Sequence, residues 1–214
     1  MSELIIKVML ADDHAVVRMG FRLLLEGAPE IRIVAEADSG EEALRRFQEV
    51  RPDVLVLDLS MPGIGGLEAL TRLMARDPAA RVLVLTAHDD VTHARRVLKA
   101  GALGYLSKRS APEALLNAIR LVHQGRTFLE PAIAQALAVQ QISGERSPVD
   151  MLSEKEFKVF LALARGQSVA DIARVMSLSP RTIGTHLYNI KQKLGAANSA
   201  ELAIVAMRHG LLEP

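Results

Sequence analysis

The chain has 214 residues, enough for one large domain or two ordinary ones, and half of them are hydrophobic, so a core can be buried. No cysteine is present, which excludes a disulfide framework and a thiolate metal site and suits a reducing cytoplasm. The formal net charge is +1, but residues 151–214 carry 8 Lys and Arg against 5 Asp and Glu, while residues 1–150 carry 18 against 20. The C-terminal part is therefore the part expected to meet a polyanion.

The N-terminal segment has no basic region and no cleavage site of a signal peptide, and its short apolar run ends at two aspartates. No stretch approaches the roughly 20 apolar residues that a membrane helix needs. We therefore expect a cytoplasmic protein that does not associate with membranes.

Five short apolar runs recur through the first 110 residues, and most are rich in β-branched side chains. They are Ile5–Leu10, Ile31–Ala35, Val54–Leu57, Val82–Leu85 and Leu103–Leu106. Their continuous apolar character indicates strands buried on both faces of a parallel sheet, and amphipathic helical patterns lie between them. The alternation predicts a doubly wound α/β domain over residues 1–124, with a five-stranded parallel sheet of the flavodoxin-like type.

Polar residues follow four of these strands: Asp12, Asp13, Asp58, Thr86 and Lys108. The carboxyl ends of parallel strands meet at one edge of a sheet, where ligands bind, so these side chains should converge. Three crowded carboxylates call for a hard cation, and oxygen ligands favour Mg²⁺. A hydroxyl and an ammonium suit the oxygens of a transferred phosphoryl group, which a carboxylate can accept. Taken singly, each residue could equally cap a helix or form a turn.

Residues 125–150 are predicted to be a linker. A short helix is expected near 131–141, and the polar stretch Ser143–Asp150 is expected to be a flexible tether. The strands are expected to stop after Gln124-Gly-Arg126.

Residues 151–214 have a purely helical pattern and form a second predicted domain of four helices. Ser153 and Glu156 form a capping-box start, and Pro180 follows Ser179 at the first turn of the third helix. The third helix buries Ile183, Leu187, Ile190 and Leu194, so Arg181, Gly184, Thr185, Tyr188 and Lys191 lie on its opposite face. A short helix, a tight turn and an exposed polar helix are typical of a helix-turn-helix, although a bundle for protein contacts would give the same pattern.

The N-terminal half resembles the receiver domains of two-component response regulators. The resemblance lies in Val8–His14, Val54–Glu68, Val84–Ala87 and Gly101–Lys108, in order and at the family's spacing. It implies that Asp58 is the phosphoacceptor and that Mg²⁺ is held by Asp13, Asp58 and the main-chain carbonyl of Ser60, with Asp12 completing the acidic pocket. It also implies that Thr86 and Lys108 bind phosphoryl oxygens and that Tyr105 is an aromatic switch, although a partly buried strand tyrosine is an equal alternative. His14 is interpreted as part of the helix start.

The C-terminal half resembles the LuxR-type helix-turn-helix of NarL/FixJ regulators. The motifs are Leu152–Glu156, Ala170–Ala173, Leu178–Ile183, His186 and Lys193–Gly195. Gly184 departs from the family, which often has lysine there, so base recognition should depend on Thr185, Tyr188 and the backbone near Gly184. Arg181, Thr182, Lys191 and Lys193 are expected to contact phosphates. Further matches at Met61–Ala69, Gly104–Lys108 and Arg208–Leu211 resemble the GacA/UvrY branch of the family.

Together the two resemblances imply a response regulator that is not an enzyme. A sensor histidine kinase would phosphorylate Asp58, and the phosphorylated chain would bind double-stranded DNA as a homodimer. One alternative is an aspartyl-phosphate phosphatase, but such enzymes usually need an acid two residues after the nucleophile, where this chain has Ser60. Another is a transcription factor that does not depend on phosphorylation, with a vestigial acidic pocket.

Overall fold

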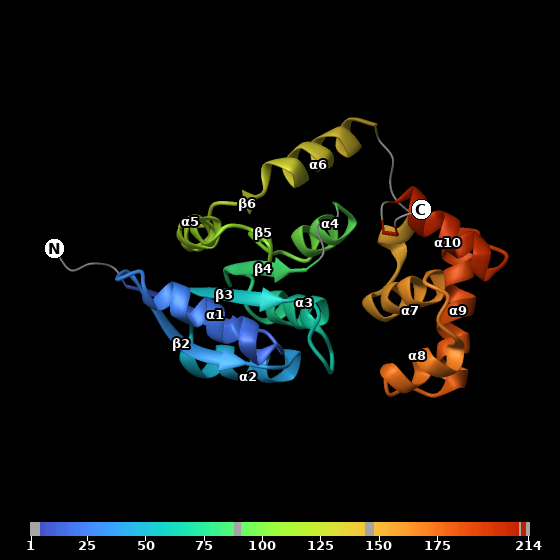
Figure 1. The fold of residues 1–214 in the computed structure, drawn as a ribbon, viewed down its shortest axis with the longest axis horizontal. Coiled ribbons are helices and arrows are strands. Elements are labelled where there is room, and N and C mark those ends of the chain that lie inside the picture. Colours follow the sequence, from blue (N-terminus) through green and yellow to red (C-terminus); the bar gives the residue numbers. More distant parts are fainter. Residues whose placement is uncertain (1–4, 88–90, 144–147, 210, 213–214) are drawn as a thin grey trace. The chain divides into compact units, whose positions relative to one another are not determined.

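A computed structural model describes residues 5–87, 91–143, 148–209 and 211–212. The chain divides into two compact units, residues 1–138 and residues 139–214. The first unit is an α/β domain and the second is helical, as the sequence predicts (Figure 1).

The first unit is built on one sheet with the strand order β2-β1-β3-β4-β5-β6. The strands are β1 (Ile6–Ala11), β2 (Ile31–Ala37), β3 (Val54–Asp58), β4 (Val82–Thr86), β5 (Gly104–Ser107) and β6 (Phe128–Leu129). All pairs are parallel, and every residue of β3, β4 and β5 is buried. The five predicted strands are therefore confirmed in the order typical of a flavodoxin-like sheet.

The prediction that no strand follows Gln124-Gly-Arg126, and that the sheet has only five strands, is wrong. The two-residue strand β6 adds a sixth parallel strand beside β5, because the Phe128 amide donates to the Leu103 carbonyl at 2.9 Å. The chain then enters α6 (Pro131–Ser143), where Ile133 is buried in the same core cluster as the strands.

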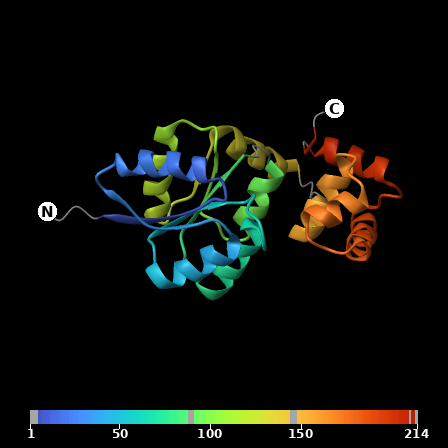
Figure 2. The same cartoon turned by 60° about the horizontal axis from the view of Figure 1, so that its bottom comes forward.

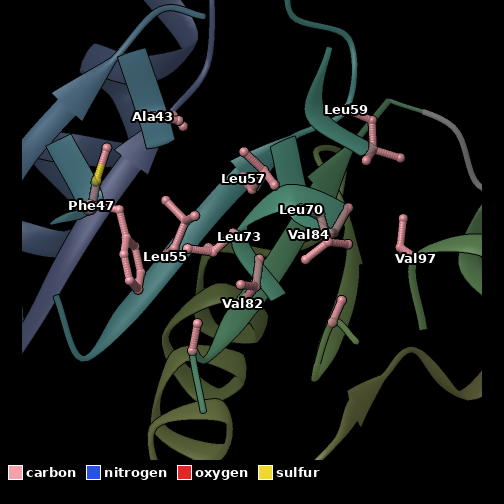
Figure 3. Packing of buried hydrophobic residues seen from close by; sticks show 14 of the residues in the cluster. Ala43, Phe47, Leu55, Leu57, Leu59, Leu70, Leu73, Val82, Val84 and Val97 are labelled. Atoms are coloured by element: carbon pink, nitrogen blue, oxygen red, sulfur yellow. The ribbon is translucent and has the colours of Figure 1, made fainter. Parts of the chain in front are cut away.

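Helices cover both faces of the sheet (Figure 2). On one face, α1 (Ala15–Glu26) and α5 (Pro112–His123) pack through Leu25, Leu115 and Ile119. On the other face lie α2 (Gly40–Val50), α3 (Gly66–Arg76) and α4 (Val91–Lys99). Figure 3 shows the second core, where side chains of β3 and β4 meet those of the helices: Phe47, Leu55, Leu57, Leu70, Leu73, Val82 and Val84. Packing in these two apolar layers holds in place the carboxyl ends of the strands, where the predicted polar site residues lie.

From residue 148 onward, the described part of the second unit has four helices and a short 3-10 helix around one apolar core. The elements are η1 (Pro148–Met151), α7 (Glu154–Ala164), α8 (Val169–Val175), α9 (Pro180–Leu194) and α10 (Ser199–Arg208). Ser153, Ser168, Ser179 and Asn198 each accept a backbone N–H at a helix start, and Gly195 ends α9 at φ 64°. These polar residues set the helix boundaries, because each satisfies donors that the first turn leaves unpaired.

The turn between α8 and α9 contains a strained residue, Ser177, at φ 53°. A left-handed conformation costs a non-glycine residue about 1–2 kcal/mol, and the extra entropy of an unfolded glycine costs about 0.5–1 kcal/mol. We therefore expect Ser177→Gly to raise the free energy of unfolding of the second unit by about 0.5 kcal/mol. Hydrogen exchange of the α8 and α9 amides measures this change, and faster exchange in the variant would contradict it.

Candidate phosphoryl-acceptor and DNA-binding sites

Three carboxylates meet at the carboxyl edge of the sheet. Asp58 is the last residue of β3, and Asp12 and Asp13 follow β1 directly. Ala11 pairs with Leu57 in the sheet, so the residues after these two emerge side by side. Asp58 is 1% exposed and Asp12 is 4% exposed, whereas Asp13 is half-buried. Buried carboxylates at such short range repel one another unless a cation compensates their charge.

The Lys108 side chain supplies one positive charge to this cluster. Its Nζ lies 2.7 Å from Oδ2 of Asp12 and 2.8 Å from Oδ2 of Asp58. Burial alone would lower the pKa of the Lys108 ammonium, but the two carboxylates outweigh burial and raise its pKa above the ordinary value. Lys108 is therefore charged at neutral pH and ties the end of β5 to the ends of β1 and β3.

The other predicted pocket residues stand on the neighbouring strand ends. Thr86 is fully buried at the end of β4, and its carbonyl accepts the Lys108 amide at 2.7 Å. The Ser60 amide donates to Oδ1 of Asp58 at 3.2 Å. Tyr105 is fully buried in β5, in the core cluster that also contains Ile133 of α6. The pocket and switch roles of these residues stay predictions.

The acidic cluster can hold a metal ion. Ligand atoms of Asp12, Asp13, His14 and Asp58 all lie within 4.8 Å of one another. Apart from the Lys108 ammonium, Oδ2 of Asp12 and Oδ2 of Asp58 have no partner among the described residues. Three carboxylates against one ammonium leave an excess of negative charge that a divalent cation would neutralise.

Two residues that the sequence analysis did not single out hold the pocket in place. The Arg18 guanidinium of α1 donates to the Asp12 carbonyl and, at 3.0 Å, to Glu36 of β2. Gly66, the first residue of α3, lies directly against the Asp58 backbone, where a Cβ would come within 2.0 Å of the Asp58 carbonyl oxygen. The sequence alone does not indicate this close approach, because it depends on how α3 returns over β3.

The second predicted site is the outer face of α9. Ile183 and Ile190 are buried, whereas Arg181, Gly184, Thr185 and Tyr188 are exposed. Tyr188 is 64% exposed, which is unusual for a large aromatic side chain. Leu187 and Leu194 are partly buried against the same core, so the predicted core stripe is confirmed. The predicted outer face is exposed except at Lys191, which is half-buried, and the DNA contacts of α9 stay predictions.

Three predicted phosphate-binding residues already have intramolecular partners. The Lys193 ammonium lies 2.6 Å from Oε2 of Glu156, and the Lys191 ammonium donates to the Ala197 carbonyl at 2.9 Å. The Thr182 hydroxyl lies 2.8 Å from that of Ser179. Contact of these residues with a phosphate would have to compete with these bonds.

Comparison with known proteins agrees with the nature of both domains. Residues 8–120 match the family described as response regulator receiver domain, and residues 150–206 match the LuxR family of bacterial regulatory proteins. The chain belongs to the LuxR-type response regulators.

Two full-length relatives place this regulator within that family. It is 42% identical to response regulator UvrY of Escherichia coli K12 over 209 residues, which are 96% of this chain and 95% of the relative. It is 39% identical to response regulator GacA of Pseudomonas syringae over 210 residues, which are 97% and 98% of the two chains. The resemblance to the GacA/UvrY branch is confirmed, and the protein is a response regulator transcription factor.

Solved structures of response regulators have the same architecture. RcsB of Salmonella enterica, bound to the rprA promoter in the presence of a phosphomimetic beryllium fluoride, aligns with a TM-score of 0.67 at 26% identity, covering 94% of this chain and 98% of that chain. A LuxR-family regulator from Aurantimonas aligns with a TM-score of 0.62 at 41% identity, covering 64% and 99%. Within the described part of this regulator, no helix is both long and apolar enough to cross a bilayer.

In the regulator's second unit, Glu156 links the start of α7 to the end of α9. Oε2 of Glu156 accepts the Ser153 amide at 2.8 Å and contacts the Lys193 ammonium at 2.6 Å. Burial alone would raise the pKa of Glu156, but Lys193 and the donors of Ser153 lower its pKa below the ordinary value. The carboxylate therefore stabilises the fold above its unfolded-state pKa, and this contribution disappears as pH falls through the lower folded-state pKa.

We expect Glu156→Gln to lower the free energy of unfolding of the second unit by about 1–2 kcal/mol at neutral pH, because it removes a charge-assisted bond. The difference between variant and wild type should shrink at acidic pH, where the wild-type carboxylate is protonated. Hydrogen exchange of the α7 and α9 amides at neutral and acidic pH measures both effects. A difference independent of pH would contradict the assigned charge.

Proposed function

We propose that Asp58 accepts a phosphoryl group from a sensor histidine kinase in the presence of Mg²⁺. The resulting aspartyl phosphate then controls dimerisation and sequence-specific DNA binding. The protein would carry out this function in the cytoplasm. The observation that carries this proposal is the contact of the Lys108 ammonium with both Asp12 and Asp58 at the ends of three strands. The Asp58 carboxylate therefore has the Lys108 ammonium and the carboxylates of Asp12 and Asp13 beside it.

In the transfer step, a carboxylate oxygen of Asp58 bonds to phosphorus while the bond from phosphorus to the kinase imidazole nitrogen breaks. The electron pair stays on the imidazole, which takes up a proton from water. Asp13, Asp58 and the main-chain carbonyl of Ser60, with Asp12 nearby, would hold Mg²⁺, which neutralises charge on the phosphoryl oxygens when bound. Lys108 then exchanges its contact with the Asp58 carboxylate for a phosphoryl oxygen, and the Thr86 hydroxyl donates to another.

Tyr105 gives this pocket a connection to the rest of the chain. Lys108 and Thr86 share a backbone hydrogen bond, and Tyr105 lies three residues before Lys108 in β5. Tyr105 is buried in the same cluster as Ile133, the third residue of α6, which leads toward the second unit. Movement of Thr86 and Lys108 toward a phosphoryl group would therefore displace Tyr105 and α6. Phosphorylation drives displacements of this kind in switch proteins.

The surface beside the pocket suits a helical kinase domain. Helix α1 begins at Ala15, two residues after Asp13, and Val16, Met19 and Leu23 are all more than 60% exposed along one of its faces. Large apolar side chains gathered on one helix face mark a protein contact. A kinase helix seated there would have its phosphohistidine near Asp58.

The second unit supplies the DNA contacts and the dimer surface. Thr185, Tyr188 and the bare backbone at Gly184 would enter the major groove, with Arg181, Thr182, Lys191 and Lys193 near phosphates. Ile204 and Met207 are exposed on α10 and offer apolar surface to a second copy. A structure of RcsB is described as two dimers bound to two parallel DNAs, which supports a homodimer on DNA for this chain.

A gel-shift measurement with the full-length protein tests the proposal. Acetyl phosphate and Mg²⁺ should raise the affinity for duplexes carrying an inverted repeat, with half-sites about one helical turn apart. Acetyl phosphate with a chelator should leave the affinity unchanged. The DNA affinity is compared without phosphodonor, with acetyl phosphate and Mg²⁺, and with acetyl phosphate and a chelator. Equal affinity in these three conditions, with phosphate verified on Asp58 in the Mg²⁺ sample, would refute the proposed control of DNA binding by phosphorylation.

A further inference from the structure

His14 lies between the acidic pocket and the first helix, and its side chain faces the pocket. Its Nδ1 is 2.9 Å from Oδ1 of Asp13 and 3.4 Å from Oδ1 of Asp12. His14 occupies the N-cap position of α1, yet its side chain makes no capping hydrogen bond among the described residues. The start of α1 therefore accounts for the backbone of His14 and leaves the position of its imidazole unexplained.

The imidazole completes a group of four potential ligands. Ligand atoms of His14 and of the three pocket carboxylates lie within 4.8 Å of one another. Nitrogen and oxygen ligands bind a first-row transition ion at about 2.0–2.2 Å, so atoms on opposite sides of the ion are about 4 Å apart. The imidazole therefore lies within reach of an ion held by the neighbouring carboxylates.

The buried carboxylates give independent support for a bound cation. Asp12 and Asp58 are almost fully buried, and their Oδ2 atoms contact only the Lys108 ammonium within the described residues. Oδ1 of Asp13 is also buried, and among the described residues its ion-pair contact is with the His14 ring. One ammonium cannot balance three carboxylates, so the pocket favours additional positive charge.

The ligand types decide which cation fits best. Mg²⁺ prefers oxygen ligands and retains water, whereas imidazole nitrogen binds Fe²⁺, Co²⁺ and Zn²⁺ well. We infer that His14 is a fourth protein ligand of the pocket and gives it a preference for a transition-metal dication over Mg²⁺. The inference rests on the pocket in the proposed function and specifies the class of metal that this pocket selects.

The alternative is that the imidazole only hydrogen-bonds Asp13. In that case His14 would orient a carboxylate for whichever cation is bound, and its removal would weaken Mg²⁺ and Co²⁺ to a similar degree. Any carboxylate site binds Co²⁺ more tightly than Mg²⁺ to some extent. The discriminating quantity is therefore the change in the ratio of the two affinities when His14 is replaced.

Titration of the full-length protein with Co²⁺ alone, with Mg²⁺ alone and in competition measures that ratio. His14→Ala should lower the Co²⁺ affinity about tenfold or more, as loss of a group that supports a metal does, and should change the Mg²⁺ affinity less than about twofold. His14→Asn should behave alike while keeping a residue suited to the N-cap, and a thermal melt of each variant verifies folding. His186→Ala, in the second unit, should leave both affinities unchanged.

A proton spectrum of the Co²⁺-loaded wild type gives a second readout. A metal-bound imidazole has a paramagnetically shifted N–H signal, and this signal should be present in wild type and His186→Ala and absent from both His14 variants. Equal loss of both affinities, or a shifted signal that survives in His14→Ala, would overturn the inference. Since no phosphodonor is used, failure to phosphorylate Asp58 would refute the proposed function and leave this result standing.

Discussion

Asp58→Asn should take up no phosphate from acetyl phosphate and Mg²⁺, while the wild type takes up one per chain. An amide has nearly the shape of a carboxylate but is not a nucleophile toward phosphorus, so the change removes the reaction with little change of volume. Mass spectrometry of the intact chain measures the effect directly. Asp38→Asn is the matched control, because Asp38 is exposed at the end of β2, outside the acidic cluster, and should be phosphorylated like the wild type.

Loss of phosphorylation in Asp58→Asn should occur without loss of folding. The substitution removes one of three crowded carboxylates, and Lys108 keeps its 2.7 Å contact with Asp12. The melting temperature of the first unit should therefore stay the same or rise, since repulsion among like charges is relieved. The variant should also show no phosphodonor-dependent rise in DNA affinity. Phosphate on Asp12 or Asp13 of the variant would show that the acceptor was assigned wrongly.

The sheet could be predicted from the sequence wherever a strand is buried on both faces. Short continuous apolar runs such as Val54–Leu57 and Val82–Leu85 are typical of strands buried on both faces of a parallel sheet. Strand β6 escaped the prediction because it has only two residues, Phe128 and Leu129, next to charged and proline residues. It forms because the carbonyl of Leu103, just before β5, accepts the Phe128 amide, and sequence periodicity carries no information about that free edge.

In the candidate sites, too, some contacts could be predicted from the sequence and others could not. The convergence of Asp12, Asp58 and Lys108 could be predicted because parallel strands bring their carboxyl ends to one edge. The contact of Lys193 with Glu156 could not, because it joins the end of α9 to the start of α7 across 37 residues. The capping-box pattern at Ser153 correctly placed Glu156 at the start of α7 and gave no sign of its second partner.

Gly66 illustrates best what only the folded chain shows. A Cβ at this position would lie 2.0 Å from the Asp58 carbonyl oxygen and 2.7 Å from the Cα of Leu59. Both are backbone atoms, so no flexible side chain can give way. Gly66 has no positive φ, and the constraint is therefore the close approach of α3 to the end of β3, with no contribution from backbone conformation.

Gly66→Ala should therefore lower the free energy of unfolding of the first unit by about 3 kcal/mol, at the upper end of the effects of overpacking. The chain that still folds must displace the Asp58 backbone, so phosphorylation by acetyl phosphate should be slower than in wild type. Gly20→Ala is the matched control, because Gly20 lies inside α1 and a Cβ there meets no described atom within 4 Å. The same substitution should stabilise that helix by up to about 1 kcal/mol. Thermal unfolding of both variants compares the signs directly, and a rise of both melting temperatures would show that helix propensity, rather than contact with Asp58, governs position 66.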